Sequence, residues 1–228
     1  MTGQTAYLAC VVFAPAPDDF AERLCVLPDV LPQPAFDALT AEIEGFVDTE
    51  RNYVPTHKKG GTIAYETLRA KTPDVAAFYR SPALQQFISD IVKIKVWPTP
   101  PHDQSSLSVL FYERPGDHIG WHYDYNFYKG RHFTVLLPIL NRGADGGLSA
   151  AKLMVRKGRD ERVIETPPNT LVVFEGAKVL HKVTPIAEGE RRIVLSMTFC
   201  ADNRHSIVQE GMRRVKDTAF FGIRALWS

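Results

Sequence analysis

Two short segments, far apart in the chain, carry residue types that bind metal ions. The first is His122-Tyr123-Asp124, and the second is an isolated His181 within the apolar stretch 179–183. Side chains two residues apart on a strand point to the same side, so the first imidazole and the carboxylate face one point. Two histidines and one carboxylate on one face of a metal leave three positions open. This arrangement is typical of Fe(II) that must also bind a co-substrate and dioxygen, whereas zinc hydrolases usually leave one position open.

Other histidines offer alternative ligands. His132 stands at the start of a predicted strand and competes with His181 for the third position. His118 and His122 are four residues apart, as in the zinc-binding pair of a helical metalloprotease. No glutamate follows His118, however, and nearby glycines oppose a helix. We therefore favour His122, Asp124 and His181.

The composition is that of a soluble globular protein. The chain has 228 residues, 45% of them apolar and 23% charged, which suits one domain. The formal net charge of +1 argues against a dedicated nucleic-acid binder. The three cysteines have no close pair, which predicts reduced thiols. No apolar run reaches the roughly 18 residues of a membrane span, and no basic residue precedes the apolar stretch 7–14, so we expect a cytoplasmic protein without a signal peptide.

The first part of the chain is predicted to be helical. Proline-rich segments at 15–34 and 97–101 mark boundaries, because proline biases the preceding residue away from the helical region. Apolar residues at helical spacing predict a helix over 34–47, and Ser81 is a plausible N-cap for a second helix that begins at Pro82. A short helix over 74–79 precedes it. The basic, glycine-containing stretch 56–61 is expected to be a flexible loop.

The second part of the chain is predicted to be β-structure. Short runs rich in branched and aromatic residues alternate with turn residues, which favours a sandwich, a barrel or a jelly roll. The predicted strands are 106–112, 133–140, 151–155, 170–174 and 191–199. Polar and apolar residues alternate over 191–199, which predicts a strand with one polar face. We expect a mainly β (α+β) single domain over 1–228, with a helical part (1–101), a β core (102–200) and a C-terminal extension (201–228), for which packing against the core is the preferred role.

The residues around the candidate ligands occur in a characteristic order. The segment 108–199 resembles the prolyl-4-hydroxylase-like branch of the Fe(II)/2-oxoglutarate-dependent dioxygenases. The matching elements are Tyr112, His122 with Asp124, Arg131 with Thr134, Asn141 followed by Gly146-Gly147, Pro168 to Phe174, His181 to Pro185, and Gly189 to Arg191. The resemblance implies a double-stranded β-helix, or jelly roll, with the metal inside one end of the barrel and the N-terminal helices packed on it.

The same resemblance assigns roles to individual residues. It implies that His122, Asp124 and His181 bind Fe(II) and form the catalytic centre. It also implies contacts to 2-oxoglutarate from three residues, which are Arg191, Tyr112 and Thr134.

The arginine assignment has a physical basis and a rival. A buried carboxylate needs a charged, forked donor, which arginine offers and lysine does not. Neighbours on a strand face opposite sides, so only one of Arg191 and Arg192 points inward. The distance in sequence from His181 favours Arg191.

The implied chemistry is oxidative decarboxylation of 2-oxoglutarate by O2, coupled to hydroxylation of an unactivated C–H. Halogenating relatives lack the ligand carboxylate, so Asp124 favours hydroxylation, or another oxidation such as desaturation, over chlorination. We expect a small-molecule substrate, for example a free amino acid or a biosynthetic intermediate, and neither nucleic acid nor membrane; an oligomer is not indicated. Candidate substrate contacts are Trp121, Tyr125, Tyr128, Arg131 and Arg69.

Two other functions fit part of the pattern. A peptidyl (prolyl-type) hydroxylase acting on a protein would share the iron chemistry. A cupin-like metal-binding isomerase or ligand-binding module without oxygenase activity would share the strands and the His/Asp set. The paired placement of Tyr112 and Arg191 argues against the second alternative.

Overall fold

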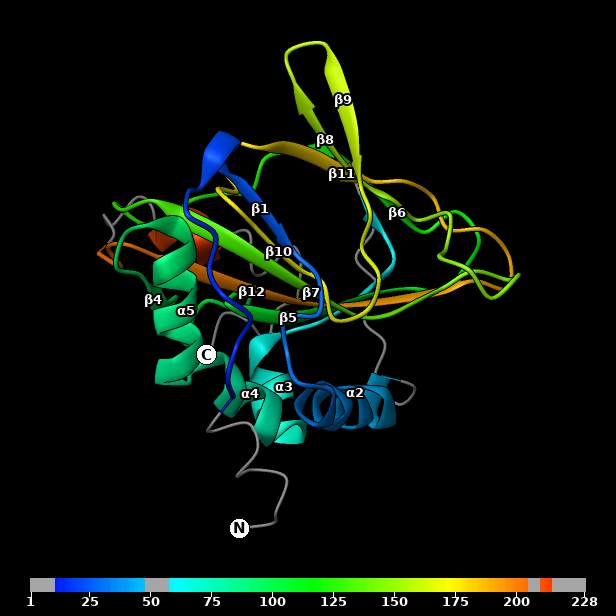
Figure 1. Cartoon of the computed structure of the whole chain (residues 1–228), viewed down its shortest axis with the longest axis horizontal. Coiled ribbons are helices and arrows are strands. Elements are labelled where there is room, and N and C mark those ends of the chain that lie inside the picture. The colour runs from blue at the N-terminus through cyan, green and yellow to red at the C-terminus, as the bar shows by residue number, and fades with distance from the viewer. Residues whose placement is uncertain (1–10, 48–57, 205–209, 215–228) are drawn as a thin grey trace.

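Two antiparallel sheets face each other in the computed structural model, which describes residues 11–47, 58–204 and 210–214 (Figure 1). Sheet A has the order β1 (Leu24–Leu27), β10 (Leu171–Phe174), β7 (His132–Arg142), β12 (Arg191–Cys200), β5 (Leu107–Tyr112) and β3 (Gly61–Ile63), and β4 (Trp97–Pro98) also pairs with β12. Sheet B has the order β2 (Lys58–Lys59), β6 (His118–His122), β11 (Leu180–Val183), β8 (Leu153–Lys157) and β9 (Asp160–Ile164).

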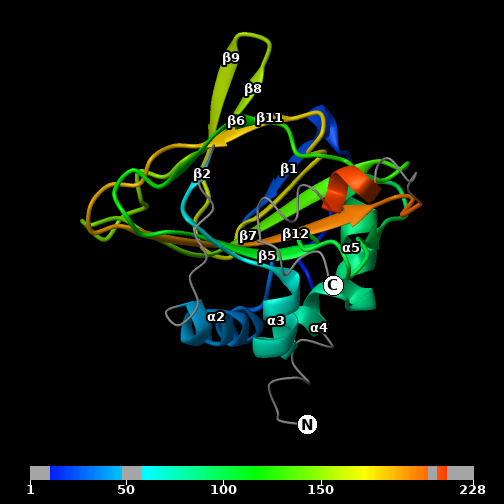
Figure 2. The same cartoon turned by 180° about the vertical axis from the view of Figure 1, so that it is seen from behind.

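From β5 onward the chain passes back and forth between the two sheets. The strands β5, β7, β10 and β12 lie in sheet A, whereas β6, β8, β9 and β11 lie in sheet B. This connectivity is that of a double-stranded β-helix, as predicted. The β8–β9 hairpin projects away from the barrel, as the view from behind also shows (Figure 2).

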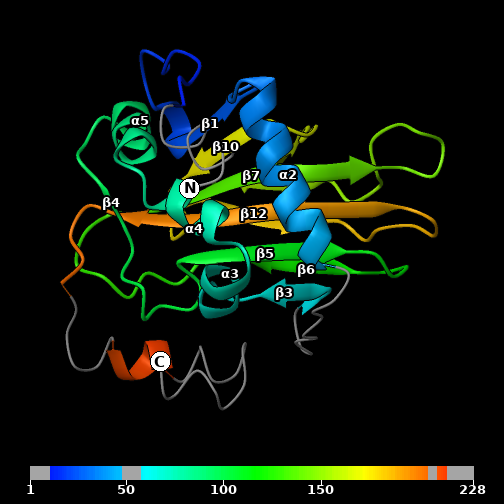
Figure 3. The same cartoon turned by 90° about the horizontal axis from the view of Figure 1, so that it is seen from below.

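Four helices line the outer face of sheet A. They are α2 (Gln33–Val47), α3 (Tyr65–Lys71), α4 (Pro73–Tyr79) and α5 (Pro82–Val92), and Figure 3 shows them against the strands. Leu39 and Ile43 of α2 are fully buried in the cluster that also contains the outer face of β12. The Ser81 side chain accepts a hydrogen bond from the Leu84 backbone N–H at 3.2 Å, which confirms the predicted N-cap of α5.

The N-terminal part is less purely helical than predicted. It contains the 3-10 turn η1 (Ala21–Arg23) and contributes β1 to β4 to the two sheets. The prediction of a flexible loop over 56–61 is wrong for the residues that the structure describes. Lys58–Lys59 pair with β6, and Gly61 begins β3. A Cβ at Gly61 would lie 1.8 Å from the Phe111 ring, so a glycine is required at this close approach. Such short strands are stabilised by the edges that they join, which their own residues do not reveal.

The strand β12 has the predicted polar face, and this face is buried. Every residue of this strand after Arg191 is buried, because one face packs under the helices and the other faces the barrel interior. The polar side chains on the interior face include Arg192, Ser196 and Thr198. Alternation therefore marks a functional interior here and not a solvated surface.

The remaining predictions concern the state of the cysteines, membrane-spanning helices and the C-terminal extension. Cys25 and Cys200 are free thiols, and Cys10 lies outside the described residues. Among the described residues, no helix is long and apolar enough to cross a membrane. Residues 210–214 form a helical turn whose Arg213 donates a hydrogen bond to the His102 carbonyl at 2.6 Å, so this part of the extension packs on the core.

Candidate metal centre

Three side chains from two strands and one loop meet between the sheets. His122 ends β6 and lies directly opposite His181 of β11 in the antiparallel pairing, with 4.1 Å between the ring centroids. Asp124 follows in the next turn, with Oδ1 at 3.5 Å from Nε2 of His122 and 3.7 Å from Nε2 of His181. The ligand atoms of all three lie within 4.8 Å of one another. Among the described residues this is the one such cluster, and neither His118 nor His132 belongs to it.

Both imidazoles are held in the orientation that a metal requires. Nδ1 of His122 lies 2.8 Å from the Gly120 carbonyl, and Nδ1 of His181 lies 3.0 Å from the Val179 carbonyl. A carbonyl oxygen only accepts, so each Nδ1 donates, and each Nε2 presents its lone pair to the common point. Burial lowers the pKa of His181, which favours the neutral form that binds a metal.

Asp124 is positioned by its own backbone and by one hydroxyl. Its backbone N–H donates to the Gly176 carbonyl at 3.0 Å, and the Thr134 hydroxyl donates a short hydrogen bond to Oδ2. Burial alone would raise the pKa of Asp124, but His181, His122 and Thr134 together hold that pKa well below its usual range. The carboxylate is therefore ionised, with Oδ1 turned to the histidines.

Gly176 makes this arrangement sterically possible. A Cβ on Gly176 would lie 2.5 Å from Oδ2 of Asp124 and 2.8 Å from the Thr134 hydroxyl. The preceding Glu175 is buried, and its Oε2 accepts hydrogen bonds from Arg23 and Arg131, both at 3.0 Å. These ion pairs fix the segment that supports Asp124. The sequence analysis did not identify Glu175 or Gly176 as functional; the available signal was a charged residue and a glycine directly after an apolar strand.

The two neighbouring arginines of β12 have different environments. Arg192 is 1% exposed, lies opposite Tyr112 of β5 in the strand pairing, and places its guanidinium 5.4 Å from that ring. Arg191 is partly exposed, and its Nε forms an ion pair with Glu113 at 2.7 Å. Arg192 is therefore the member of the pair that points into the barrel, the reverse of the facing expected from the distance to His181. Alternation along the strand, and not the distance from His181, sets the side that each residue faces.

The surroundings of Arg192 fit a buried carboxylate. Its Nε and the Tyr112 hydroxyl are buried without a hydrogen-bond partner in the described part of the chain. Burial raises the pKa of Tyr112 to about 12, so its hydroxyl remains a donor. Burial lowers the pKa of the Arg192 guanidinium, and the neighbouring Tyr112 acts in the opposite direction. Unsatisfied buried donors are costly, and a carboxylate would satisfy both. Tyr112 and Phe174, which packs on the His181 ring at 4.7 Å, belong to one interior cluster, so this pair and the metal centre share the barrel.

The candidate substrate residues are distributed over several places. Trp121 lies between the cations of Arg156 and Lys182, at 4.2 Å and 4.5 Å from them. Because it neighbours His122 on a strand, its side chain is on the opposite, outer face. Tyr125 is 65% exposed and stacks on Phe127.

The other three candidates have partners or positions of their own. Tyr128 is buried and donates a hydrogen bond to Asp103 at 2.8 Å, which is a packing role. Arg131 pairs with Glu175 beside the metal centre. Arg69 is exposed near the end of α3, in the helical layer outside sheet A, so it does not face the barrel interior.

Comparisons with known proteins agree with this geometry. A family model described as Halogenase D matches residues 15–144, which is more than half of the 228 residues. The model of the 2OG-Fe(II) oxygenase superfamily matches residues 107–199. No curated protein matches the chain.

Solved structures share the fold. A prolyl-4-hydroxylase from Pseudomonas putida is 19% identical with a TM-score of 0.59, and the match covers 88% of this chain and 99% of the other. The non-heme alpha ketoglutarate dependent epimerase SnoN from nogalamycin biosynthesis is 12% identical with a TM-score of 0.61, covering 78% of each chain. A prolyl hydroxylase from Trichoplax adhaerens, in complex with a hypoxia inducible factor peptide, is 12% identical with a TM-score of 0.60, covering 84% and 87%.

The jelly roll, the His-His-Asp cluster and the family match define a 2OG-Fe(II) oxygenase that uses Fe(II), 2-oxoglutarate and O2. The chain belongs to the Halogenase D family. This result confirms the predicted enzyme class and argues against a cupin-like protein without oxygenase activity.

Proposed function

We propose that the protein hydroxylates an unactivated C–H of a small molecule. The observation that carries this proposal is Asp124, which completes a two-histidine, one-carboxylate set in a chain whose family is described as Halogenase D. A carboxylate in this position occupies the coordination site that a halide takes in halogenating relatives. Its presence supports oxygen transfer over halogen transfer.

The residues of the site have different roles in the proposed reaction. His122, His181 and Asp124 would hold Fe(II), which together with 2-oxoglutarate and O2 would supply the oxidising power. Arg192 would donate to the far carboxylate of 2-oxoglutarate, and Tyr112 would donate from the neighbouring strand. Thr134 orients Asp124 and reaches the co-substrate only through that carboxylate. The apolar cluster around Phe174 packs against the His181 side of the centre.

The first experiment tests the co-substrate assignment without a known substrate. Fe(II) and 2-oxoglutarate are added to the protein in the absence of oxygen, and the visible charge-transfer band of the chelate is recorded. We expect the band in the wild type. Its absence, with iron confirmed bound, would contradict the proposal.

The second experiment tests the reaction type. Metabolites and prolyl peptides are screened for stimulated release of succinate in buffer with chloride, and products are analysed by mass spectrometry. We expect a small molecule that gains one oxygen atom. A mainly chlorinated product would overturn hydroxylation, and a response to peptides alone would overturn the small-molecule assignment.

A further inference from the structure

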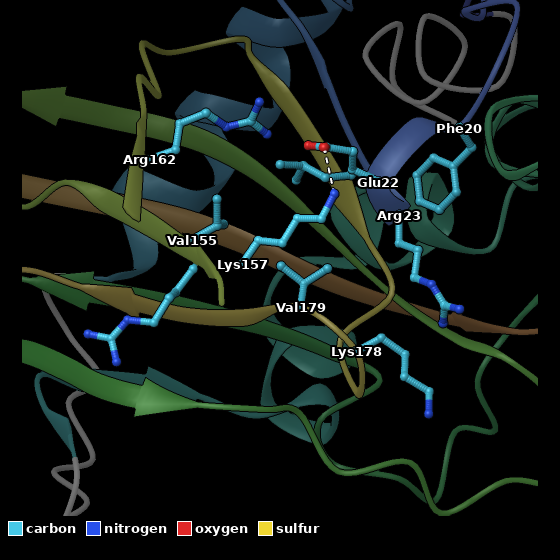
Figure 4. Close-up of a pocket in the computed structure, with 10 residues that line it drawn as sticks. Phe20, Glu22, Arg23, Val155, Lys157, Arg162, Lys178 and Val179 are labelled. Atoms are coloured by element: carbon cyan, nitrogen blue, oxygen red, sulfur yellow. Dashed lines mark hydrogen bonds and ion pairs between the residues drawn. The ribbon is translucent and has the colours of Figure 1, made fainter. Parts of the chain in front are cut away.

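Figure 4 shows a pocket that is lined largely by cationic side chains. Its volume is about 380 Å³, and it lies between η1 and β1 on one side and the β8–β9 hairpin with the start of β11 on the other. Its charged lining includes Arg23, Lys157, Arg162 and Lys178. Its apolar lining includes Val155 and Val179.

The pocket adjoins His181 through its apolar lining. Val155 lies directly opposite His181 in the β8–β11 pairing, and such partners lie on the same face of the sheet, with Cα atoms about 5 Å apart. The Val179 carbonyl is the acceptor that orients the His181 ring. Leu24, another lining residue, pairs with Phe174, which packs on the same ring. A molecule in the pocket would therefore rest against the residues that surround one iron ligand.

The charges in the pocket are only partly compensated. Lys157 forms an ion pair with Glu22 at 2.9 Å, and Arg23 shares the single carboxylate of Glu175 with Arg131. Within the described ranges, Lys178 has no hydrogen bond or ion pair from its side chain. Arg162 also forms none, although its charge helps to lower the pKa of Glu22. Figure 4 shows these two side chains on opposite sides of the Glu22–Lys157 pair. The result is a local excess of positive charge in a chain whose formal net charge is only +1.

We propose that this pocket binds the anionic group, carboxylate or phosphate, of the primary substrate. Arg162 and Lys178 supply the charge, and the valines support an apolar part that leads toward the iron. The proposal rests on the proposed function, since it names the substrate class of the same site. It assigns 2-oxoglutarate to Arg192, which lies on the other sheet, and not to this pocket.

The test uses four small aromatic probes that differ in charge: phenyl phosphate, benzoate, benzamide and benzylamine. Each is titrated by calorimetry into the full chain loaded with Fe(II) and 2-oxoglutarate without oxygen. We expect the two anions to bind, more weakly at high salt, while the neutral and cationic probes do not. Binding of phenyl phosphate alone or benzoate alone would identify phosphate or carboxylate as the recognised group.

A double variant and a matched control locate the binding. Arg162→Gln/Lys178→Gln should weaken the anions about tenfold or more, which corresponds to about 1.4 kcal/mol or more. Lys71→Gln/Lys95→Gln removes the same charge from exposed positions outside the pocket and should leave binding unchanged. The affinity for 2-oxoglutarate should be the same in both variants.

Three results would overturn the proposal. They are equal binding of benzamide, unchanged anion binding in the pocket variant, and loss of 2-oxoglutarate affinity in that variant. Failure of the oxygenase proposal is separate: the chelate band would be absent in the wild type, while calorimetry would still show whether the pocket selects anions.

Discussion

The two faces of β12 carry out different tasks on one strand. On the outer face, Ile193, Leu195 and Met197 pack into the cluster shared with the helices. On the inner face, Arg192 lies beside Tyr112, and both carry buried donors without a partner among the described residues. The outer face gains free energy from apolar burial, whereas the inner face retains costly buried polar groups. The helical layer therefore stabilises the barrel, whereas the barrel interior is organised for binding.

The largest effect is expected on the outer face. Leu195→Ala should lower the free energy of unfolding by about 2–5 kcal/mol, because Leu195 is fully buried and the variant leaves a cavity. Denaturant unfolding measures this loss. The affinity of the folded protein for 2-oxoglutarate should stay unchanged. As a control, Val163→Ala on β9, where the side chain is 45% exposed, should change stability by less than about 0.5 kcal/mol. A large loss of 2-oxoglutarate affinity in Leu195→Ala would show that the two faces of β12 do not have separate roles.

The next effect is expected on the inner face. Arg192→Leu should weaken 2-oxoglutarate binding about a hundredfold or more, because it removes a pair of charge-assisted hydrogen bonds that contribute about 1.5–3 kcal/mol each. Anaerobic titration of the chelate band measures the change. Arg191→Leu removes an ion pair with Glu113 and should leave the band unchanged. If Arg191→Leu loses affinity and Arg192→Leu keeps it, the assignment of the interior arginine is wrong.

A smaller effect is expected from the support of Asp124. Gly176→Ala should lower the affinity for Fe(II) about 10- to 100-fold, because the added Cβ displaces the Asp124 carboxylate and the Thr134 hydroxyl. Metal titration with and without 2-oxoglutarate measures it. Gly45→Ala on α2 makes the same substitution where a Cβ meets nothing within 4 Å, so it should leave iron binding intact. Equal iron affinity in the Gly176 variant and the wild type would show that the close approach is not functional.

Much of the fold was predictable from local patterns. The apolar spacing in α2, the Ser81 cap of α5 and the β-rich runs of the second half all agree with the structure. The strands β1 to β4, β6, β9 and β11 and the helix α3 were not among the predicted elements. Their residues form short segments whose structure depends on a neighbouring sheet edge or helix, so the local sequence carries little signal for them.

The sequence by itself determined which residue types are available for the chemistry. His122, Asp124 and His181 were selected by type, spacing and order, and the structure brings them together. Tertiary structure alone decided that Arg192 and not Arg191 enters the barrel, that Gly176 lies against Asp124, and that cations from η1, β8, β9 and the β10–β11 turn meet in one pocket. The physical reason is that ligand type is a property of single residues. Whether a side chain is buried, which side of a sheet it faces and whether its charge is compensated are decided only when segments distant in sequence pack together.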